Sequence, residues 1–222
     1  MKKCVLFDLD GTLIDSSEGI IKSILHTLNY YGMEPEDEGT LRKFIGPPLH
    51  ESFSKYYGFT KEEAMNAVTV FRERYNVKGL FECSLYPGVK ECLKKLREEG
   101  YLIGIASSKP EITCKRILEY HGVLDCFDEV SGASMDGKVE TKIEVLKQLF
   151  ARLPEIDKSN VILIGDTIFD VKGANEAGLK TIAVSFGFGD ADEMVKTGAL
   201  AICDNMANLP EILSNEDIWK CN

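Results

Sequence analysis

Histidine, basic charge and long apolar runs are scarce in this sequence. Its three histidines, His26, His50 and His121, show no metal-ligand spacing, so the chemistry of a zinc hydrolase has no support. Lys+Arg 26 against Asp+Glu 36 give a net charge of −10, which argues against broad binding of nucleic acid or of an anionic membrane. No uncharged apolar run approaches the roughly 18 residues that a membrane span needs.

Paired cysteines and a secretion signal are also missing. The seven cysteines include no C-x-x-C pair, so we expect free and mostly buried thiols. The N-terminal apolar run is interrupted at Asp8, before it reaches the roughly seven residues that a signal peptide needs. Together these features predict a cytoplasmic protein in a reducing compartment.

Short apolar runs rich in β-formers alternate with helical patterns along most of the chain. The apolar runs are 4–7, 102–106, 161–164 and 181–184, with a weaker one at 129–131. Helical spacing of apolar residues recurs at 89–99, 112–120 and 142–150. This alternation predicts βαβ units around a parallel sheet.

Residues 16–80 break the alternation, because they show helical patterns and no convincing strand. Asp15 with Glu18 predicts a capping box for a helix through Tyr31, and Thr60 with Glu63 predicts another at the start of a helix over 61–77. We expect a helical insert at 16–80 within a doubly wound α/β domain formed by 1–15 and 81–222.

Two pairs of aspartates follow apolar strands. Asp8 and Asp10 come directly after the first run, and Asp166 and Asp170 follow the run at 161–164. Aspartate is common in turns and at helix starts, which is the simpler interpretation of each pair alone. In open α/β sheets, however, ligands bind beyond the carboxyl ends of the strands. Four carboxylates without histidine or cysteine predict a Mg²⁺ site.

A third strand end carries hydroxyls and a lysine. Ser107, Ser108 and Lys109 precede Pro110, and such groups at a helix N-terminus can hold an anion or simply cap the helix. Lys142 opens the next predicted helix. A lysine is usually only a solvated surface group, so only the combination with the other motifs supports Lys142 as a site residue.

The ordered motifs resemble those of the haloacid dehalogenase superfamily. The resemblance spans about 4–215 and is carried by Phe7-Asp8-Leu9-Asp10-Gly11-Thr12-Leu13, Ser107, Lys142 and Gly165-Asp166…Asp170. The insert at 16–80 resembles the helical cap of the phosphoglycolate-phosphatase-like branch, as do Phe44-Ile45-Gly46-Pro47-Pro48-Leu49, Tyr86-Pro87-Gly88 and Ala106-Ser107-Ser108-Lys109-Pro110. One departure is that no proline follows Lys138 or Lys142. Lys142 stands at the start of a predicted helix, where some members of the branch place the motif lysine, so the resemblance favours Lys142, with Lys138 and Lys109 as alternatives.

The resemblance implies a five-stranded sheet in the order 3-2-1-4-5 and a Mg²⁺-dependent phosphatase. Asp8 would be the nucleophile that forms an aspartyl phosphate, and Asp10 would be the general acid and then the base. Asp8, the Asp10 backbone carbonyl and Asp166 would hold Mg²⁺, with Asp170 close by or bound through water. Ser107 and Lys142 would bind the phosphoryl oxygens.

The resemblance also implies that the cap closes over the site and selects the leaving group. The expected substrate contacts are Ser107, Ser108, Lys109, Lys142, Gly46, Pro47 and Leu49. The expected partner is a small phosphorylated metabolite, without nucleic acid or membrane, for a monomer or homodimer. The substrate itself stays open between phosphoglycolate and a nucleoside monophosphate, which a 5'-nucleotidase would hydrolyse.

Four other functions can be compared with the same motifs, and only that of a phosphomutase fits them equally well. A phosphomutase related to β-phosphoglucomutase shares all four motifs. A true dehalogenase is disfavoured, because Asp10, Asp166 and Asp170 together indicate a metal that dehalogenation does not use. A phosphoacceptor domain of the response-regulator kind lacks a helical insert, and intact Asp8 and Asp10 argue against a non-enzymatic binding domain.

Overall fold

A computed structural model describes residues 2–220 and divides the chain into two compact units. One unit comprises Met1–Ile14 and Leu85–Asn222, and the other comprises Asp15–Ser84. Two short strands, β2 (Ile14–Asp15) and β3 (Ser84–Leu85), pair where the chain crosses from one unit to the other.

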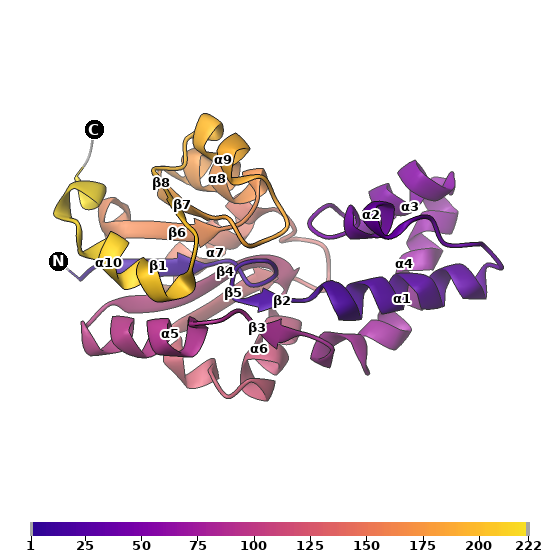
Figure 1. The fold of residues 1–222 in the computed structure, drawn as a ribbon, viewed down its shortest axis with the longest axis horizontal. Coiled ribbons are helices and arrows are strands. Elements are labelled where there is room, and N and C mark those ends of the chain that lie inside the picture. The colour runs from indigo at the N-terminus through magenta and orange to yellow at the C-terminus, as the bar shows by residue number, and fades with distance from the viewer. Residues whose placement is uncertain (1, 221–222) are drawn as a thin grey trace. The chain divides into compact units, whose positions relative to one another are not determined.

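The first unit contains a parallel sheet of six strands in the order β5-β4-β1-β6-β7-β8 (Figure 1). The strands are β1 (Cys4–Phe7), β4 (Leu102–Pro110), β5 (Glu129–Ala133), β6 (Val161–Gly165), β7 (Lys180–Val184) and β8 (Ala201–Cys203). The predicted doubly wound sheet and the order of its first five strands are confirmed. The predicted count of five strands is one short, because β8 is a three-residue edge strand with little apolar pattern.

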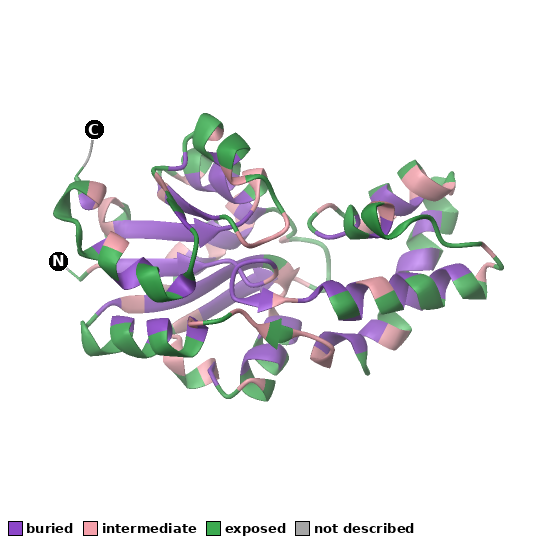
Figure 2. Ribbon diagram, viewed as in Figure 1, coloured by how far each residue is buried: buried purple, intermediate pink, exposed green. Residues whose placement is uncertain are grey.

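Helices connect these strands and cover the sheet. They are α5 (Val89–Glu98), α6 (Glu111–Tyr120), α7 (Lys142–Arg152), α8 (Ile168–Ala177), α9 (Ala191–Thr197) and α10 (Leu209–Ser214). The 3₁₀ turns are η2 (Leu124–Cys126), η3 (Lys158–Asn160), η4 (Met206–Asn208) and η5 (Glu216–Trp219). Buried side chains of β1, β6, α7 and α8 form one continuous apolar cluster. Every residue of β1 and β6 is buried (Figure 2), so these two strands form the centre of the sheet.

The second unit is helical, with α1 (Ser17–Tyr30), α2 (Glu38–Arg42), α3 (Leu49–Tyr57), α4 (Lys61–Tyr75) and the turn η1 (Gly79–Phe81). α4 packs against both α1 and α3, and Phe44, Phe53 and Phe71 are buried among these helices. The predicted capping box at Thr60 and Glu63 is present. The one predicted at Asp15 and Glu18 is wrong, because Ser16 is the N-cap of α1 and makes no side-chain capping bond.

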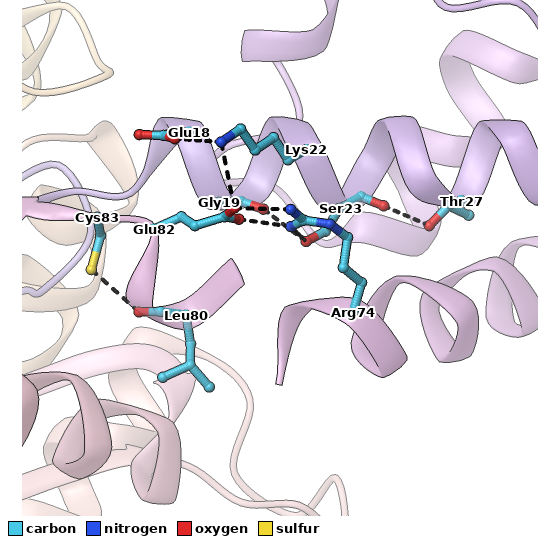
Figure 3. Close-up of polar contacts among 9 residues, drawn as sticks. All are labelled: Glu18, Gly19, Lys22, Ser23, Thr27, Arg74, Leu80, Glu82 and Cys83. Carbon is cyan, nitrogen blue, oxygen red and sulfur yellow. Dashed lines mark hydrogen bonds and ion pairs between the residues drawn. The ribbon is translucent and has the colours of Figure 1, made fainter. Parts of the chain in front are cut away.

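At the start of α1, Asp15 Oδ1 accepts from the N–H of Ser17 at 2.9 Å, and the returning chain satisfies a further N–H of the first turn. The backbone N–H of Gly19 donates to the carbonyl of Glu82 at 3.0 Å. Figure 3 shows Arg74 of α4 reaching the same segment, where its guanidinium donates to both carboxylate oxygens of Glu82 at 2.8 and 3.0 Å. The same Arg74 donates to Ser23 Oγ at 3.1 Å. The first turns of α1, the end of α4 and residues 79–82 are thus fastened together.

The six cysteines in the described part of the chain are all free thiols, and four of them are buried. The expectation of free, mostly buried thiols is met for these six, whereas Cys221 lies outside the described residues. Within residues 2–220, none of the helices combines the length and the apolar character needed to cross a bilayer.

Candidate active site

Asp8 stands at the carboxyl end of the central strand β1. Its N–H donates to the carbonyl of Ile164 in β6 at 2.9 Å, which continues the β1–β6 pairing by one residue. Its neighbours in the sheet are β4 and β6, whose connections run to opposite edges of the sheet. This is a topological switch point, where open α/β sheets place their ligands. Asp8 is only 8% exposed, so its carboxylate has little water around it.

Gly11 turns the chain immediately after Asp10. Its φ of +79° lies in the left-handed region that glycine tolerates best. A Cβ at this position would lie 2.0 Å from Asp166 Oδ2, so a side chain would displace that carboxylate. The next residue, Thr12, donates from Oγ1 to Asp166 Oδ1 at 3.3 Å. The turn after β1 therefore packs directly on the second acidic pair.

The second acidic pair lies at the end of β6 and the start of α8, and both aspartates are at most 2% exposed. The N–H of Phe188 donates to Asp166 Oδ2 at 2.9 Å. Thr167, the N-cap of α8, donates from its N–H and its hydroxyl to Asp170 Oδ2 at 3.0 and 2.9 Å. Asp170 is thereby held by the N-terminus of its own helix, and Asp166 by the backbone of the loop after β7.

Lys142, the first residue of α7, projects into the same region. Its ammonium lies 2.6 Å from Asp8 Oδ1 and 2.8 Å from Asp170 Oδ1, and it donates to the carbonyl of Ala106 at 2.7 Å. Lys138, the nearby alternative, has a side chain that is 82% exposed and pairs with Asp136. Of these two lysines, the structure brings Lys142 to the carboxylates.

Asp8, Asp166 and Asp170 can each offer one carboxylate oxygen such that all three oxygens lie within 4.8 Å of one another. When ionised they carry three negative charges against the single positive charge of Lys142. The two negative charges left over suit a divalent cation, and carboxylate oxygens are the ligands that Mg²⁺ prefers. The donor set of these residues therefore fits a Mg²⁺ ion.

Burial and mutual repulsion alter the protonation of the cluster in the metal-free state. Burial, opposed by the charge of Lys142, raises the pKa of Asp8 from 3.8 to about 6. Burial, followed by the charges of Asp170 and Asp8, raises the pKa of Asp166 well above 3.8. Burial would lower the pKa of Lys142, but Asp170 and Asp8 outweigh it and raise that pKa. Lys142 is therefore a permanent cation beside the cluster.

The residues from Ser107 to Lys109 belong to strand β4, which extends through Pro110 instead of ending at 106. The alternative of a helix cap at Ser107 is therefore wrong, because α6 begins only at Glu111 and its N-cap is Pro110. Ser107 is 2% exposed, whereas Ser108, the next residue of the strand, is exposed. Lys109 pairs with the carboxylate of Asp10 at 2.8 Å.

Gly46, Pro47 and Leu49, the other predicted substrate contacts, belong to the second unit. Gly46 has a φ of +102°, and it is followed by Pro47 and Pro48 in the connection between α2 and α3. Leu49 is the first residue of α3 and is half-buried.

Three contributors to the cluster were not among the predicted site residues. Thr12 stands in the motif after Asp10, so its proximity had a sequence signal. The backbone N–H of Phe188 had none, because it comes from the loop after β7. Gly173 of α8 was also missed: a Cβ there would lie 2.7 Å from Cβ and Cγ of Lys142. The glycine leaves the space through which the stem of Lys142 passes.

Comparisons with known proteins place this arrangement in one family. The family model of haloacid dehalogenase-like hydrolases matches residues 5–184. A 5'-nucleotidase of Pseudomonas aeruginosa is 34% identical over 95% of this chain and 95% of its own. The tyrosine-protein kinase PtkA of Mycobacterium tuberculosis is 38% identical over 89% of this chain and 67% of its own.

Solved structures agree with the sequence comparisons. The crystal structure of a predicted phosphatase from Clostridium acetobutylicum is 40% identical, with a TM-score of 0.88, and the match covers 96% of this chain and 99% of that one. The match to the family model, the related phosphatases and the buried acidic cluster confirm the resemblance seen in the motifs. The chain belongs to the haloacid dehalogenase-like hydrolase family and is a phosphatase within it.

Proposed function

We propose that the chain hydrolyses a small phosphate monoester by transferring the phosphoryl group to Asp8 and then to water. The observation that carries this proposal is the pairing of Asp8 Oδ1 with Lys142 Nζ at 2.6 Å, at the end of a fully buried strand. A carboxylate held in this way is a fixed nucleophile. The adjacent ammonium is placed to balance negative charge on a phosphoryl group.

Mg²⁺ is the proposed cofactor. The carboxylates of Asp8 and Asp166 and the backbone carbonyl of Asp10 would hold the ion, with Asp170 in contact or bound through water. When bound, the ion supplies positive charge that offsets the repulsion between the anionic nucleophile and the anionic substrate. The convergence of three buried carboxylates supports this assignment.

The remaining steps are assigned to side chains of this chain. In the first step Asp8 attacks phosphorus, the ester P–O bond breaks, and Asp10 donates a proton to the departing alcohol oxygen. In the second step Asp10 accepts a proton from water, the water oxygen attacks phosphorus, and the Asp8–phosphorus bond breaks. Ser107 and Lys142 bind the phosphoryl oxygens in both steps. Such contacts matter because positioning and charge stabilisation account for most of the catalysis of phosphoryl transfer.

The domain roles are part of the proposal. Residues 1–15 and 81–222 would form the catalytic core, and residues 16–80 would form a cap that selects the leaving group. Gly46, Pro47 and Leu49 would contact that group, and Ser108 and Lys109 would line the core side of the site. The helical composition of unit 15–84 and its rigid Gly-Pro-Pro connection support the assignment.

The substrate is proposed as a small phosphorylated metabolite. Phosphoglycolate is suggested by the motif resemblance, and a nucleoside monophosphate is the second candidate because of the related 5'-nucleotidase. A phosphomutase activity is the third. We further propose that the protein acts in the cytoplasm as a monomer or homodimer.

A panel of phosphorylated metabolites, assayed with Mg²⁺ and with EDTA, tests the proposal. We expect Mg²⁺-dependent release of inorganic phosphate, and none from Asp8→Asn. Retention of phosphate on an isomerised sugar would instead identify a phosphomutase. Release of phosphate by Asp8→Asn near the wild-type rate would overturn the assignment of the nucleophile.

A further inference from the structure

The ammonium of Lys109 forms hydrogen bonds with both carboxylate oxygens of Asp10. Its Nζ donates to Oδ1 at 2.9 Å and to Oδ2 at 2.8 Å, so both oxygens of Asp10 share one ammonium. The side chains of Lys109 and Asp10 are 7% and 22% exposed. The contact joins two residues that are far apart in the sequence but lie on adjacent, hydrogen-bonded strands or directly after them.

The backbone around Lys109 fixes the direction of this side chain. The pairing of β4 with β5 shifts register between Ser107 and Pro110, a bulge of the kind that redirects a side chain near a site. The N–H of Lys109 donates to Ser107 Oγ at 3.3 Å. Pro110 restricts Lys109 to extended backbone. Gly132 of β5 leaves room for the bulge, since a Cβ there would lie 2.6 Å from the Lys109 carbonyl oxygen.

We propose that Lys109 is a positioning residue that holds the Asp10 carboxylate in the orientation from which it exchanges protons with the leaving group and with water. The inference rests on the proposed function, in which Asp10 is the general acid and base. Lys109 itself gives up no proton: the Asp10 O–H bond breaks, the alcohol O–H bond forms, and the ammonium stays beside the resulting carboxylate. Fixing Asp10 in advance removes the cost of ordering it during the reaction.

A direct role of Lys109 in binding phosphate is the competing interpretation. An ammonium has three N–H donors, and the contact with Asp10 uses two of them. Lys142, in contrast, pairs with the proposed nucleophile itself. The two lysines therefore serve different carboxylates, and the loss of each should have a different kinetic consequence.

Leaving-group dependence separates the two interpretations. p-Nitrophenolate departs as a stable anion and needs no proton, whereas an alkyl alcohol does. The substrates are p-nitrophenyl phosphate and one alkyl phosphate that the wild type hydrolyses, and the variants are Lys109→Met, Lys109→Arg, Asp10→Asn and the double variant Lys109→Met/Asp10→Asn. Lys94→Met, an exposed lysine of α5 paired with Glu98, is the matched control.

We expect Lys109→Met to lower kcat for the alkyl phosphate, with little change in KM. With p-nitrophenyl phosphate, the same variant should lower the rate of the phosphorylation step by a factor that is at least about tenfold smaller. Lys109→Arg should recover part of the loss. In the Asp10→Asn background, removing Lys109 should cost less than about twofold, because the two changes remove one function. Lys94→Met should match the wild type.

The opposite pattern would overturn the inference. Equal losses on both esters, a raised KM and additive effects of Lys109→Met and Asp10→Asn would identify Lys109 as a phosphate ligand. If Lys109→Met does not fold, as judged by thermal melting, Lys109→Gln enters the same comparison. A separate result would show that the proposed function itself is wrong. That result is the absence of Mg²⁺-dependent hydrolysis in the wild type, or full activity in Asp8→Asn.

Discussion

Gly173 of α8 lies against the side chain of Lys142, and a Cβ on that glycine would come within 2.7 Å of Lys142 Cβ and Cγ. These atoms are near the backbone of α7 and cannot swing away as the end of a flexible side chain could. The ammonium at the other end of this side chain contacts both Asp8 and Asp170. One missing methyl group in α8 thus sets the position of the cation at the candidate site.

Gly173→Ala should therefore impair catalysis more than folding. Alanine gains about 1 kcal/mol of helix propensity over glycine, which offsets part of the steric cost. We expect kcat/KM to fall at least about tenfold, because small displacements of a catalytic group have large effects. Kinetics and urea unfolding of the same sample check this, with Lys172→Ala at an exposed position of the same helix as the control. Unchanged kcat/KM in Gly173→Ala would show that Lys142 tolerates displacement.

The stability of the metal-free protein should depend on the charge of Asp8. Its folded-state pKa of about 6 lies above the ordinary 3.8, so the folded state keeps a proton that the unfolded state has lost. Stability is then fully present below about pH 4 and falls as pH rises to about 6, by about 3 kcal/mol for this group. In EDTA, Asp8→Asn should be more stable than the wild type at pH 7, and this advantage should vanish near pH 4.

Addition of Mg²⁺ gives the matching test. Mg²⁺ must replace the proton on Asp8, so the ion should raise the melting temperature of the wild type at pH 7.5 and do so less below pH 6. Asp8→Asn should show a smaller rise at every pH. A rise that is equal in both proteins would place the ion away from Asp8.

The ion pair between Arg74 and Glu82 should stabilise the second unit. Its side chains are 18% and 25% exposed, so Glu82→Gln leaves a largely buried guanidinium without its partner charge. We expect a loss of about 1–2 kcal/mol in unfolding free energy at pH 7. The hydrogen bond from Arg74 holds the pKa of Glu82 below 4.5, so this stabilisation should be lost as pH falls through that lowered pKa.

Glu38→Gln provides the control for that measurement. Glu38 pairs with Arg42 in the same unit, but the two side chains are 72% and 52% exposed. Such a surface pair is worth less than about 0.5 kcal/mol. Equal losses for the two variants in urea unfolding would mean that burial does not set the strength of the Arg74–Glu82 pair.

Changes in the second unit should alter the choice of substrate. If residues 16–80 select the leaving group, Leu49→Ala and Arg42→Ala should shift relative kcat/KM among four or five phosphate esters. Activity on p-nitrophenyl phosphate and the melting temperature should change less. A uniform loss on all esters together with a lower melting temperature would show that these residues only pack their own unit.

The fold was predictable where apolar residues repeat at the spacing of a strand or helix. The site was predictable where its residues form one continuous motif in the sequence. The strands at 4–7 and 161–165 and the two acidic pairs were visible because each is a continuous stretch of sequence. The edge strand β8 is too short to show a period. The capping of α1 was predicted incorrectly because its partner is the Glu82 carbonyl, contributed by the distant returning segment.

The sequence favoured Lys142 over Lys138 because Lys142 starts a predicted helix, and the structure brings Lys142 to the carboxylates. The space that Gly173 leaves for the stem of Lys142 had no sequence signal. The pairing of Lys109 with Asp10 depends on a bulge in β4, and Phe188 reaches Asp166 through its backbone alone. Contacts of these kinds depend on packing between elements, for which a single sequence carries little signal.

Trapping the phosphorylated enzyme tests the proposed mechanism most directly. Asp10→Asn removes the base that activates water, so hydrolysis of the aspartyl phosphate should slow by about 10²–10⁴-fold while a good leaving group still departs. After mixing with p-nitrophenyl phosphate and Mg²⁺ and rapid acid quenching, mass spectrometry should find phosphate on the peptide that contains Asp8. Steady phosphate release by Asp10→Asn at more than about a tenth of the wild-type rate, with no phosphate on that peptide, would contradict the mechanism.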